Sequence, residues 1–373
     1  MLWLALAFPI VAATILAIGW KRKVNVWEFV GLFMIPLAFI AITRFTAEYV
    51  MTHSTEYWGG YVVRATYYEP WNEYIHRTCT GSCGKDCTYT YDCSYVAYYP
   101  AYWEITDSNG ESWHVSQNKW QELVTRWHNK HFVDMHRPYY TIDGDAYVTD
   151  FDAVYNHAEI TTKTHLYENR VQASHSIFNF PEITKNKAKE LRLFDHPPVD
   201  GYQQVPVLGI GVQIPNVWDR SVDLINGFLG KKCKARVFVL MWRDKPLSIA
   251  TNQQAYWKNG NKNELTVCIG VDAKNRPQWC FPFGWTKLES LKADTRDFVM
   301  KQKTLDVVPL ADMLYKEIYP NILRRDFREF SYIVVDPPLW VVILTFMLVI
   351  GFCFGWGIWS VENEYDGDGT CST

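Results

Sequence analysis

The sequence predicts an α+β fold in which three hydrophobic membrane helices flank a large central region. Three long apolar segments, at residues 1–20, 26–45 and 337–361 of the 373-residue chain, are each of membrane-spanning length. Between the second and third segments, strand-like alternation gives way to alternating strands and helices. We therefore expect a mainly-β module at residues 46–198 and an α/β module at residues 199–333.

The first apolar segment contains no charged residue through Trp20 and is followed at once by Lys21-Arg22-Lys23. About twenty helical residues span about 30 Å, the thickness of the hydrocarbon layer. A cleavable signal peptide carries its positive charges before the apolar run. The reversed order here predicts a retained helix.

The second apolar segment is bounded by Glu28 and Arg44, which shorten its uncharged part to Phe29–Thr43. We expect the Arg44 side chain to extend toward the membrane interface, where its charge stays hydrated. A buried helix of a soluble domain is the alternative interpretation. The third segment is uncharged and ends with Trp356 and Trp359, which suit an interfacial aromatic belt.

The short loop Lys21-Arg22-Lys23 predicts the orientation of the chain, because short loops rich in Lys and Arg stay in the cytoplasm. The central region then lies outside the cytoplasm of an inner or cell membrane, and the acidic tail at residues 362–373 lies inside. Arg324, Arg325 and Arg328 oppose this orientation, but large domains translocate largely regardless of charge.

In the mainly-β module, aromatic and β-branched residues dominate Tyr61–Tyr68 and Tyr95–Trp103, as is typical of half-buried strands. Asp107-Ser108-Asn109-Gly110 and Asp143-Gly144-Asp145 carry the turn residues of hairpins. One helix is expected after the N-cap residue Ser116, with four apolar residues at helical spacing: Trp120, Leu123, Val124 and Trp127.

The boundary between the modules is predicted at Asp195-His196-Pro197-Pro198. Beyond it, the apolar pattern predicts strands at residues 236–242, 265–271 and 278–283, and helices at residues 246–257 and 310–319. Thr286 and Glu289 form the pattern of a capping box before a further helix. The core face of that helix is expected to contain Leu288, Leu291, Thr295, Phe298 and Val299.

Four of the nine cysteines, Cys79, Cys83, Cys87 and Cys93, lie in one loop between strand-like segments. We expect a Cys79–Cys93 disulfide that clamps this loop, and a second bridge fits inside it. Free thiols and zinc are the alternatives, although the C-x3-C-x3-C-x5-C spacing lacks the paired C-x2-C knuckles of structural zinc sites.

Cys268 and Cys280 lie at equal distance in sequence from Lys274, the centre of a predicted turn. In a hairpin with this turn they would face each other across two strands, within disulfide range if oxidised. A buried reduced pair is the alternative.

Acidic residues and histidines raise the hypothesis of a metal site. Asp143, Asp145, Asp150 and Asp152 supply the carboxylates that calcium prefers, although their spacing differs from an EF-hand and a turn explains Asp143-Gly144. The histidines lack the Glu of a His-Glu-x-x-His zinc-protease motif; they are His128, His131, His136, His157, His165 and His175. We expect no cofactor, with calcium or zinc as the alternatives.

Composition and motifs exclude some classes of function. A net charge of −3 provides no basic field for nucleic acid. Neither a phosphate-binding Gly-Lys-Ser/Thr loop nor a Gly-x-Ser-x-Gly nucleophile elbow occurs, so no catalytic residue is indicated. The chain has no Asn-x-Ser/Thr glycosylation acceptor, which favours a bacterial or phage-type origin.

In the α/β module, the strand Val237–Met241 leads through a helix to Trp257, and a turn with Gly260 and Asn263 precedes the strand Leu265–Val271. This order resembles the TPM domain, a thylakoid phosphatase-like domain of membrane-tethered bacterial proteins. Glu264 stands where that family often has glycine, and no residue here matches the family's acidic metal ligands. The resemblance implies an α/β fold and a phosphatase-type activity.

The whole chain also resembles multi-pass membrane proteins of tailed phages and bacteria that have no assigned activity. Two segments carry this likeness, Tyr68–Tyr74 and Tyr167–Ser176. The likeness implies origin rather than mechanism.

Aromatic residues make up 16% of the chain, and rings of this kind supply large contact surfaces. We expect a membrane-anchored envelope scaffold or interaction protein that binds a protein partner, or another copy of itself, through aromatic surface, with the lipid bilayer as its other partner. The alternative is a membrane-tethered metal-dependent hydrolase of phosphatase type. Clustered carboxylates in a pocket of residues 200–330 favour the hydrolase, and a broad aromatic surface favours the interaction protein.

Overall fold

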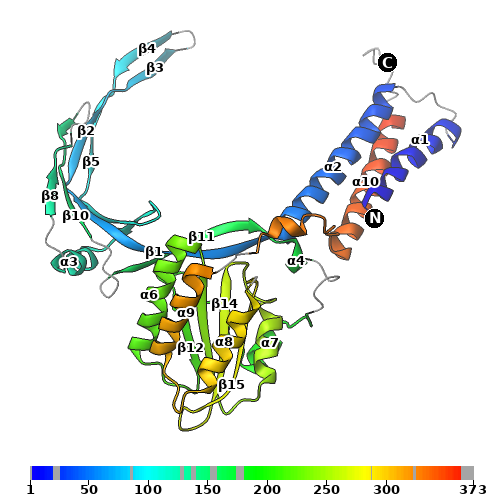
Figure 1. Ribbon diagram of the computed structural model, residues 1–373. Coiled ribbons are helices and arrows are strands. Elements are labelled where there is room, and N and C mark those ends of the chain that lie inside the picture. The colour runs from blue at the N-terminus through cyan, green and yellow to red at the C-terminus, as the bar shows by residue number, and fades with distance from the viewer. Residues whose placement is uncertain are drawn as a thin grey trace. The chain divides into compact units, whose positions relative to one another are not determined.

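The computed structural model describes residues 2–19, 26–84, 87–126, 130–135, 140–151, 158–173, 180–286, 288–321 and 325–362. The chain forms two compact units (Figure 1). The smaller unit contains Met1–Ser54, Leu166–Asn179 and Phe327–Thr373, and the larger unit contains Thr55–His165 and Phe180–Asp326. The larger unit holds most of the predicted mainly-β module and most of the predicted α/β module, whereas residues 46–54, 166–179 and 327–333 belong to the smaller unit.

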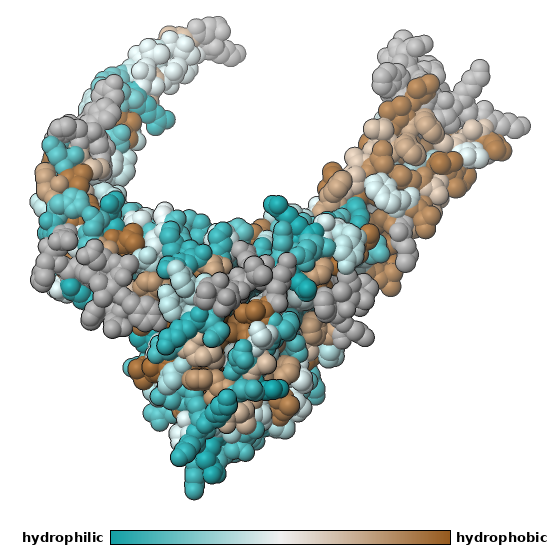
Figure 2. All heavy atoms as spheres, viewed as in Figure 1, coloured by the Kyte–Doolittle hydropathy of each residue, from teal (hydrophilic) through white to brown (hydrophobic). Residues whose placement is uncertain are grey.

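Hydrophobic helices dominate the smaller unit, as the brown surface in Figure 2 shows. They are α1 (Ala7–Gly19), which follows the 3₁₀-helix η1 (Leu2–Leu6), α2 (Val26–Thr52) and α10 (Leu339–Glu362). Buried apolar residues of η1, α2 and α10 pack together, and Phe8, Ala12 and Ala13 of α1 pack against them. The buried residues are Leu2, Ala5, Leu32, Ile40, Val349 and Cys353. At Gly31 of α2 the indole of Trp356 comes so close that a Cβ would lie 2.8 Å from it, so this helix contact requires glycine.

Among the described residues, two helices are long and apolar enough to cross a membrane, Phe29–Thr52 and Leu339–Trp359. The prediction of three spanning helices is wrong for the first segment, residues 1–20. Its α-helical part, α1, has 13 residues. Together with η1 it forms the apolar helix Leu2–Ile18, which at about 1.5 Å per residue rises about 25 Å, less than the about 30 Å of hydrocarbon that a span must cross.

The second segment is longer than predicted, because α2 continues to Thr52 instead of ending near residue 45. Arg44 lies inside this helix, where it donates a hydrogen bond to the carbonyl of Val335 and pairs with Glu48 at 3.3 Å. Glu48 also pairs with Arg170 of α4 (Arg170–Ala173) at 2.8 Å. The arginine charge is therefore matched inside the unit by a carboxylate and a helix-flanking carbonyl.

In the larger unit, the strand β1 (His53–Tyr68) is the centre of a six-stranded sheet. The order is β7-β6-β1-β10-β8, and β11 also pairs with β1. The bounds are β6 (Tyr102–Asp107), β7 (Ser112–Val115), β8 (Lys130–Val133), β10 (Ala146–Asp150) and β11 (Ile160–Glu168). The helix α3 (Gln117–Thr125) begins after Ser116, whose hydroxyl accepts a hydrogen bond from the Lys119 N–H at 3.3 Å, as predicted. Its Trp120 and Leu123 are buried against this sheet, and Trp127 lies outside the described residues.

The first predicted hairpin is confirmed and the second is wrong. β6 and β7 pair around Asp107–Gly110, with Gly110 at φ +84. The strands beside Asp143-Gly144-Asp145 belong to different sheets, because β9 (Tyr140–Ile142) pairs with β2 (Trp71–Ile75) whereas β10 pairs with β1. Gly144 has φ +59, and a Cβ there would lie 2.9 Å from the Glu69 carbonyl. The chain therefore crosses between sheets here and does not fold back on itself.

The α/β module contains the sheet β12 (Val207–Ile210), β13 (Arg236–Arg243), β14 (Glu264–Val271) and β15 (Pro277–Gly284), in that order. The first three strands are parallel and β15 is antiparallel. One face packs on α6 (Asn216–Cys233), α8 (Glu289–Met300) and α9 (Val307–Asn321), and the other packs on α7 (Ser248–Tyr256). The remaining elements are α5 (Lys185–Leu191) and the 3₁₀-helix η3 (Phe327–Phe330), the latter in the smaller unit. This is the three-layer arrangement that alternating buried strands and helices dictate.

The predicted capping box does not form. The N-cap residue of α8 is Leu288, which makes no side-chain cap bond. Thr286 lies two residues before the N-cap position, and its hydroxyl instead accepts a hydrogen bond from the Leu288 N–H at 3.0 Å. The predicted core face is confirmed in part, since Leu291, Thr295 and Val299 are buried.

Cys268 and Cys280 do not face each other, so the prediction that they lie within disulfide range is wrong and the alternative, reduced buried cysteines, holds. The register pairs Cys268 with Phe281 and Ile269 with Cys280, because a bulge at Gly270/Val271 shifts the ladder by one residue. A one-residue shift turns a side chain to the opposite face of the sheet. Cys268 lies in the core beside α7 and Cys280 in the core beside α8, and both are free thiols. Burial raises the pKa of Cys280 to about 12.

Candidate functional site: a disulfide-bonded aromatic arm

A long antiparallel ribbon at residues 71–99, called the arm below, continues the pairing of β1 with β6, and β9 pairs with its base along β2. It comprises β2, β3 (Thr78–Gly84), β4 (Cys87–Asp92) and β5 (Tyr95–Tyr99), with β2 paired to β5 and β3 paired to β4 (Figure 1). Pro70 and Pro100 lie opposite each other between the Tyr68–Tyr102 and Trp71–Tyr99 pairs. Because proline has no N–H for the ladder, this pair of prolines separates the arm from the main sheet.

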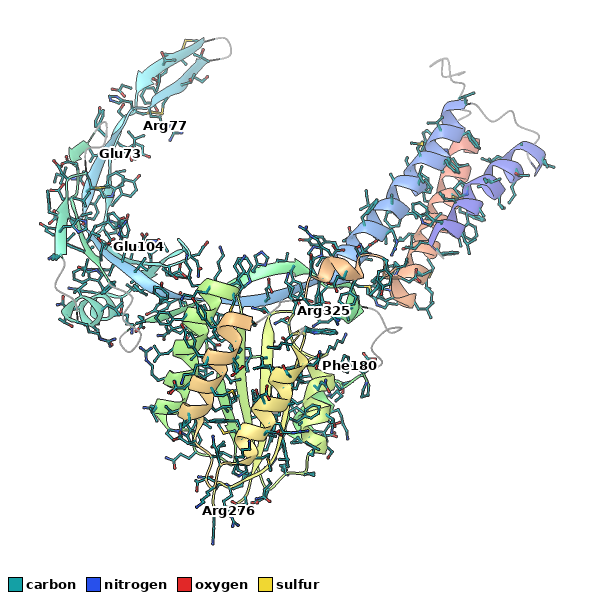
Figure 3. All side chains as sticks on the ribbon, in the orientation of Figure 1. Glu73, Arg77, Glu104, Phe180, Arg276 and Arg325 are labelled. Atoms are coloured by element: carbon teal, nitrogen blue, oxygen red, sulfur yellow. A yellow bond between two sulfur atoms is a disulfide. The ribbon has the colours of Figure 1, made fainter. Side chains whose placement is uncertain are left out.

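The arm has no hydrophobic core of its own. Every residue of β4 is exposed, and no described residue of the four arm strands is buried. Figure 3 shows side chains standing out along the ribbon, where Glu73 and Arg77 are labelled. An isolated two-stranded ribbon is only marginally stable in water. Something other than apolar burial must therefore hold the strands together.

Two disulfides supply that stability. Cys79 is bonded to Cys93, with 5.8 Å between the Cα atoms, and Cys83 is bonded to Cys87, with 5.1 Å. The two sides of the arm are also joined between its strand pairs, because the Cys93 N–H donates a hydrogen bond to the Arg77 carbonyl at 2.9 Å. Closing loops of these lengths contributes about 3 kcal/mol and about 2 kcal/mol in the chain-entropy account. The segment that the sequence predicted to be a cysteine-rich loop is thus a β-ribbon with two disulfides.

Tyrosines cover the exposed faces of the arm. Tyr91 is 48% exposed and Tyr98 is 68% exposed, and Tyr89 and Tyr95 are similarly open. Near the base, Tyr99 stacks on Trp71 with 3.8 Å between ring centroids and donates a hydrogen bond to Glu73 at 3.1 Å. Tyrosine rings provide large amphipathic contact area and lose little rotamer entropy when they are buried. The arm has the surface of a binding element.

The acidic residues considered for calcium carry other contacts. Asp145 accepts a hydrogen bond from the Met135 N–H at 3.2 Å, and Asp150 pairs with Arg64 at 2.8 Å and with His131 at 3.8 Å. Asp152 lies outside the described residues, as do His128, His136, His157 and His175. Within the described part of the chain, no group of three His, Cys, Asp or Glu side chains is placed to hold a metal ion.

A feature that sequence reasoning missed is a buried polar cluster where β1 and β11 cross the starts of β13 and β14. Arg236 is fully buried and donates to the Thr162 hydroxyl at 3.2 Å, and burial lowers its pKa to about 10. Glu264 accepts hydrogen bonds from the backbone N–H and the side-chain amide of Asn261 at 2.9 and 2.6 Å. The Nε2 atom of His196 lies 3.6 Å from the Glu264 carboxylate. The charges of Arg236 and Glu264 are thus held in a water-poor interior.

The same cluster extends to β1 through Glu56, which is fully buried. His165 Nδ1 and Lys262 Nζ lie 3.1 and 3.5 Å from the Glu56 carboxylate. Beside Glu264 is a cavity of about 10 Å³, lined by Cys233, Lys234, Ala235, Lys262, Asn263, Glu264 and Thr286. Small-molecule pockets are usually about 300–1,000 Å³. The cluster is therefore better suited to joining the two modules than to holding a substrate.

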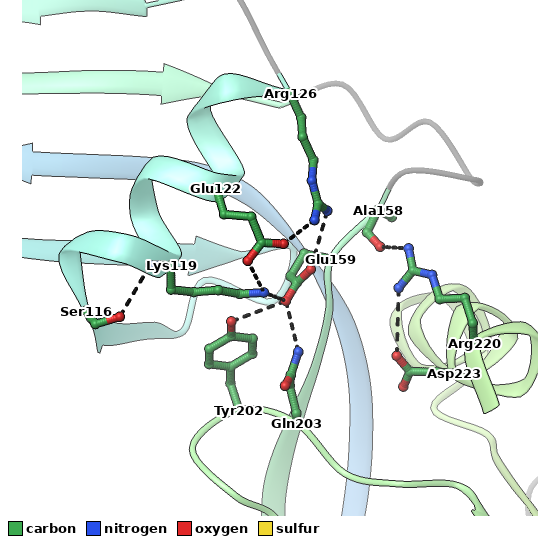
Figure 4. Close-up of polar contacts among 10 residues, drawn as sticks. All are labelled: Ser116, Lys119, Glu122, Arg126, Ala158, Glu159, Tyr202, Gln203, Arg220 and Asp223. Carbon is green, nitrogen blue, oxygen red and sulfur yellow. Dashed lines mark hydrogen bonds and ion pairs between the residues drawn. The ribbon is translucent and has the colours of Figure 1, made fainter. Parts of the chain in front are cut away.

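A second polar network joins the modules around Glu159 (Figure 4). Its carboxylate accepts from Lys119 at 2.8 Å, from the Gln203 amide at 2.9 Å and from the Tyr202 hydroxyl at 3.2 Å. Beside it, Arg220 donates to the Ala158 carbonyl and lies 3.9 Å from Asp223. Burial raises the pKa of Asp223 to about 7, although the positive charge of Arg236 opposes this shift.

The only sequence signal for the buried cluster is the position of its two charged residues in their strands. Arg236 and Glu264 each stand at the first position of an apolar strand, where a charge is ordinarily taken as the solvated end of that strand. Only the crossing of β1 and β11 over this edge buries them. Comparison of the chain with protein-family models, with curated proteins and with solved structures finds no match.

Proposed function

We propose that the chain is a membrane-anchored interaction protein of the cell envelope, held by α2 and α10, whose arm binds a protein partner. The observation that carries this proposal is the arm, in which exposed tyrosines stand on a ribbon stabilised by disulfides in place of a core. A protein that keeps aromatic surface exposed and rigid gains contact area at little entropic cost when a partner covers it.

We place the larger unit outside the cytoplasm. Disulfides persist in oxidising compartments and are rare in the cytosol, and the arm carries two of them. The basic residues Lys21-Arg22-Lys23 between the first two apolar segments support the same orientation. In this orientation the arm faces partners in the envelope.

We also propose that the α/β module is a TPM-like domain that serves as a rigid base for the arm. The order of β13, α7 and the turn after Trp257 that leads into β14 supports the likeness. Trp257 is buried and its indole N–H donates to the Phe194 carbonyl at 2.8 Å. Glu264, at the position where the family often has glycine, is used in the buried cluster.

The interaction function is tested by photo-crosslinking in intact cells. A photoreactive amino acid is placed at Tyr91 or Tyr98 of the full-length chain, and at the exposed Glu190 of α5 as a control. We expect a discrete crosslinked protein from both arm positions and none from Glu190. The product should decrease when Cys79→Ser and Cys93→Ser release the ribbon. Identical products from all three positions, or lipid alone, would contradict the proposal.

A further inference from the structure

The strand β5 has an open edge. It is the outer strand of the sheet β5-β2-β9, and within the described residues its second side pairs with no strand. Its sequence, Tyr95-Val96-Ala97-Tyr98-Tyr99, contains no charge. Natural sheets usually protect such an edge with charges, internal prolines or bulges, because an open edge is a template for another strand. Here Pro100 follows only after the strand, so none of these devices interrupts the backbone edge of β5 among the described residues.

The residues of β5 are complementary to a second copy of themselves. In an antiparallel pair centred on Ala97, this smallest residue meets its own counterpart on a twofold axis. Val96 then lies opposite Tyr98, and Tyr95 lies opposite Tyr99. Aromatic residues opposite β-branched ones are favourable cross-strand pairs. We propose that β5 pairs in this register with β5 of a second copy of the chain, an inference that rests on the proposed interaction function of the arm.

Exposure and charge favour the second copy over another extended partner. Val96 and Tyr98, which point to one face of the sheet, are 52% and 68% exposed, and in this register each covers the other copy's residue. No charge opposes a like charge, because Asp92, the nearest charged residue before β5, falls opposite Tyr102. The β5-β2-β9 sheets of the two copies then form one continuous sheet. Because the same strand of each copy makes the contact, the interface is isologous and closes as a dimer. Anchoring in one membrane raises the local concentration of arms, so a short interface suffices.

A cysteine at the twofold axis tests the register. In full-length protein carrying Cys233→Ser and Cys371→Ser, Ala97→Cys is expected to form a covalent dimer in native membranes under mild oxidation. Directly opposed residues have Cα atoms about 4.5–5.5 Å apart, which a disulfide bridges. Tyr95→Cys alone is the matched control, because its own counterpart lies about 13 Å away. Chains with Tyr95→Cys and chains with Tyr99→Cys should dimerise only when they are mixed.

A charge exchange gives a second test that needs no new disulfide. Val96→Lys should reduce the dimer that photo-crosslinking from Ala97 captures, because a charge is then buried against Tyr98. Coexpression with chains carrying Tyr98→Asp should restore it, since the two charges face each other. Mass spectrometry of the Cys79–Cys93 disulfide verifies that each variant arm has folded.

The outcomes separate this inference from the proposed function. A crosslinked product of twice the chain mass from Tyr98, with the Ala97→Cys dimer, supports self-pairing. Arm-specific products with other proteins only, or equal dimer formation by Tyr95→Cys alone, overturn self-pairing and leave the interaction function standing. The absence of any arm-specific product overturns both.

Discussion

Arg236 shows how a single buried charge is kept inside the larger unit. Its guanidinium makes one hydrogen bond to Thr162 and lies 5.4 Å from the ring centroid of Phe238. The carboxylates of Asp223 and Glu264 act on it through space and raise its pKa, while burial lowers it more strongly. The arginine is therefore stabilised by a field of two carboxylates without a direct ion pair.

Replacing Arg236 with methionine should lower the free energy of unfolding by about 3 kcal/mol or more, because the buried carboxylate of Glu264 loses its compensating charge. Urea unfolding of the full-length protein in detergent measures the change. Lys274→Met on the exposed turn before β15 is the control and should change stability by less than about 0.5 kcal/mol. Equal stability of the two variants would show that the charge of Arg236 is not structural.

Asp223 predicts a pH dependence of stability. Because its folded-state pKa of about 7 is above the ordinary 3.8, the folded chain holds this proton more tightly than the unfolded chain. The stabilisation from this group is complete below about pH 4 and is lost as the pH rises to about 7. Asp223→Asn should match the native chain near pH 3.5 and be more stable by about 4 kcal/mol at pH 7.5. Parallel urea curves at the two pH values measure this, and a difference that does not vary with pH would contradict it.

At the scale of elements, the strands of the larger unit are stabilised in two different ways. β13 and β14 are buried on both faces, and their apolar residues hold the helices on each side. The arm strands bury nothing and depend on cross-links and on the ladder itself. Removal of a disulfide should therefore change the local stability of the arm and leave that of the α/β sheet unchanged.

Removing the Cys79–Cys93 disulfide by Cys79→Ser and Cys93→Ser should destabilise the arm alone, by about 3 kcal/mol of local opening free energy. Amide hydrogen exchange measured by mass spectrometry should become faster at residues 71–99 and stay unchanged in β13 and β14. Cys83→Ser with Cys87→Ser, which opens the shorter loop, is the matched variant and should have the smaller effect. Faster exchange throughout the larger unit would mean that the arm is part of the core.

At the scale of the whole molecule, the chain separates apolar and polar surfaces between two units. The smaller unit exposes large apolar side chains along α2 and α10, among them Phe45, Met347 and Phe354. Such surface is stable in lipid and unfavourable in water. The larger unit has an ordinary buried core, and its exposed tyrosines gather on the arm, with Phe132 and Tyr319 exposed elsewhere.

The orientation proposed for the membrane predicts which cysteines an impermeant reagent reaches. After reduction of intact cells, a membrane-impermeant thiol reagent should label Cys79 and Cys93 but not Cys371. Peptide mass spectrometry identifies the labelled residues, and permeabilised cells provide the positive control. Labelling of Cys371 alone would reverse the orientation.

Local patterns predicted most of the elements because their causes are local. The apolar run around Val237 predicts a strand that is buried on both faces, and Ser116 caps its helix through the neighbouring N–H of Lys119. The failures in strand pairing are contacts between segments that local patterns do not connect. The bulge beside Gly270 separated Cys268 from Cys280, and Gly144 carries the chain between two sheets.

The sequence alone determined where the apolar segments lie, which cysteines share one loop, and that strands precede an α/β module. These features follow from composition and spacing within a few tens of residues. Tertiary structure alone decided that the cysteine loop is an uncovered ribbon, that β5 has an open edge, and that Arg236 and Glu264 are buried. The physical reason is that burial and exposure depend on which distant strand covers a surface, and no local pattern specifies that.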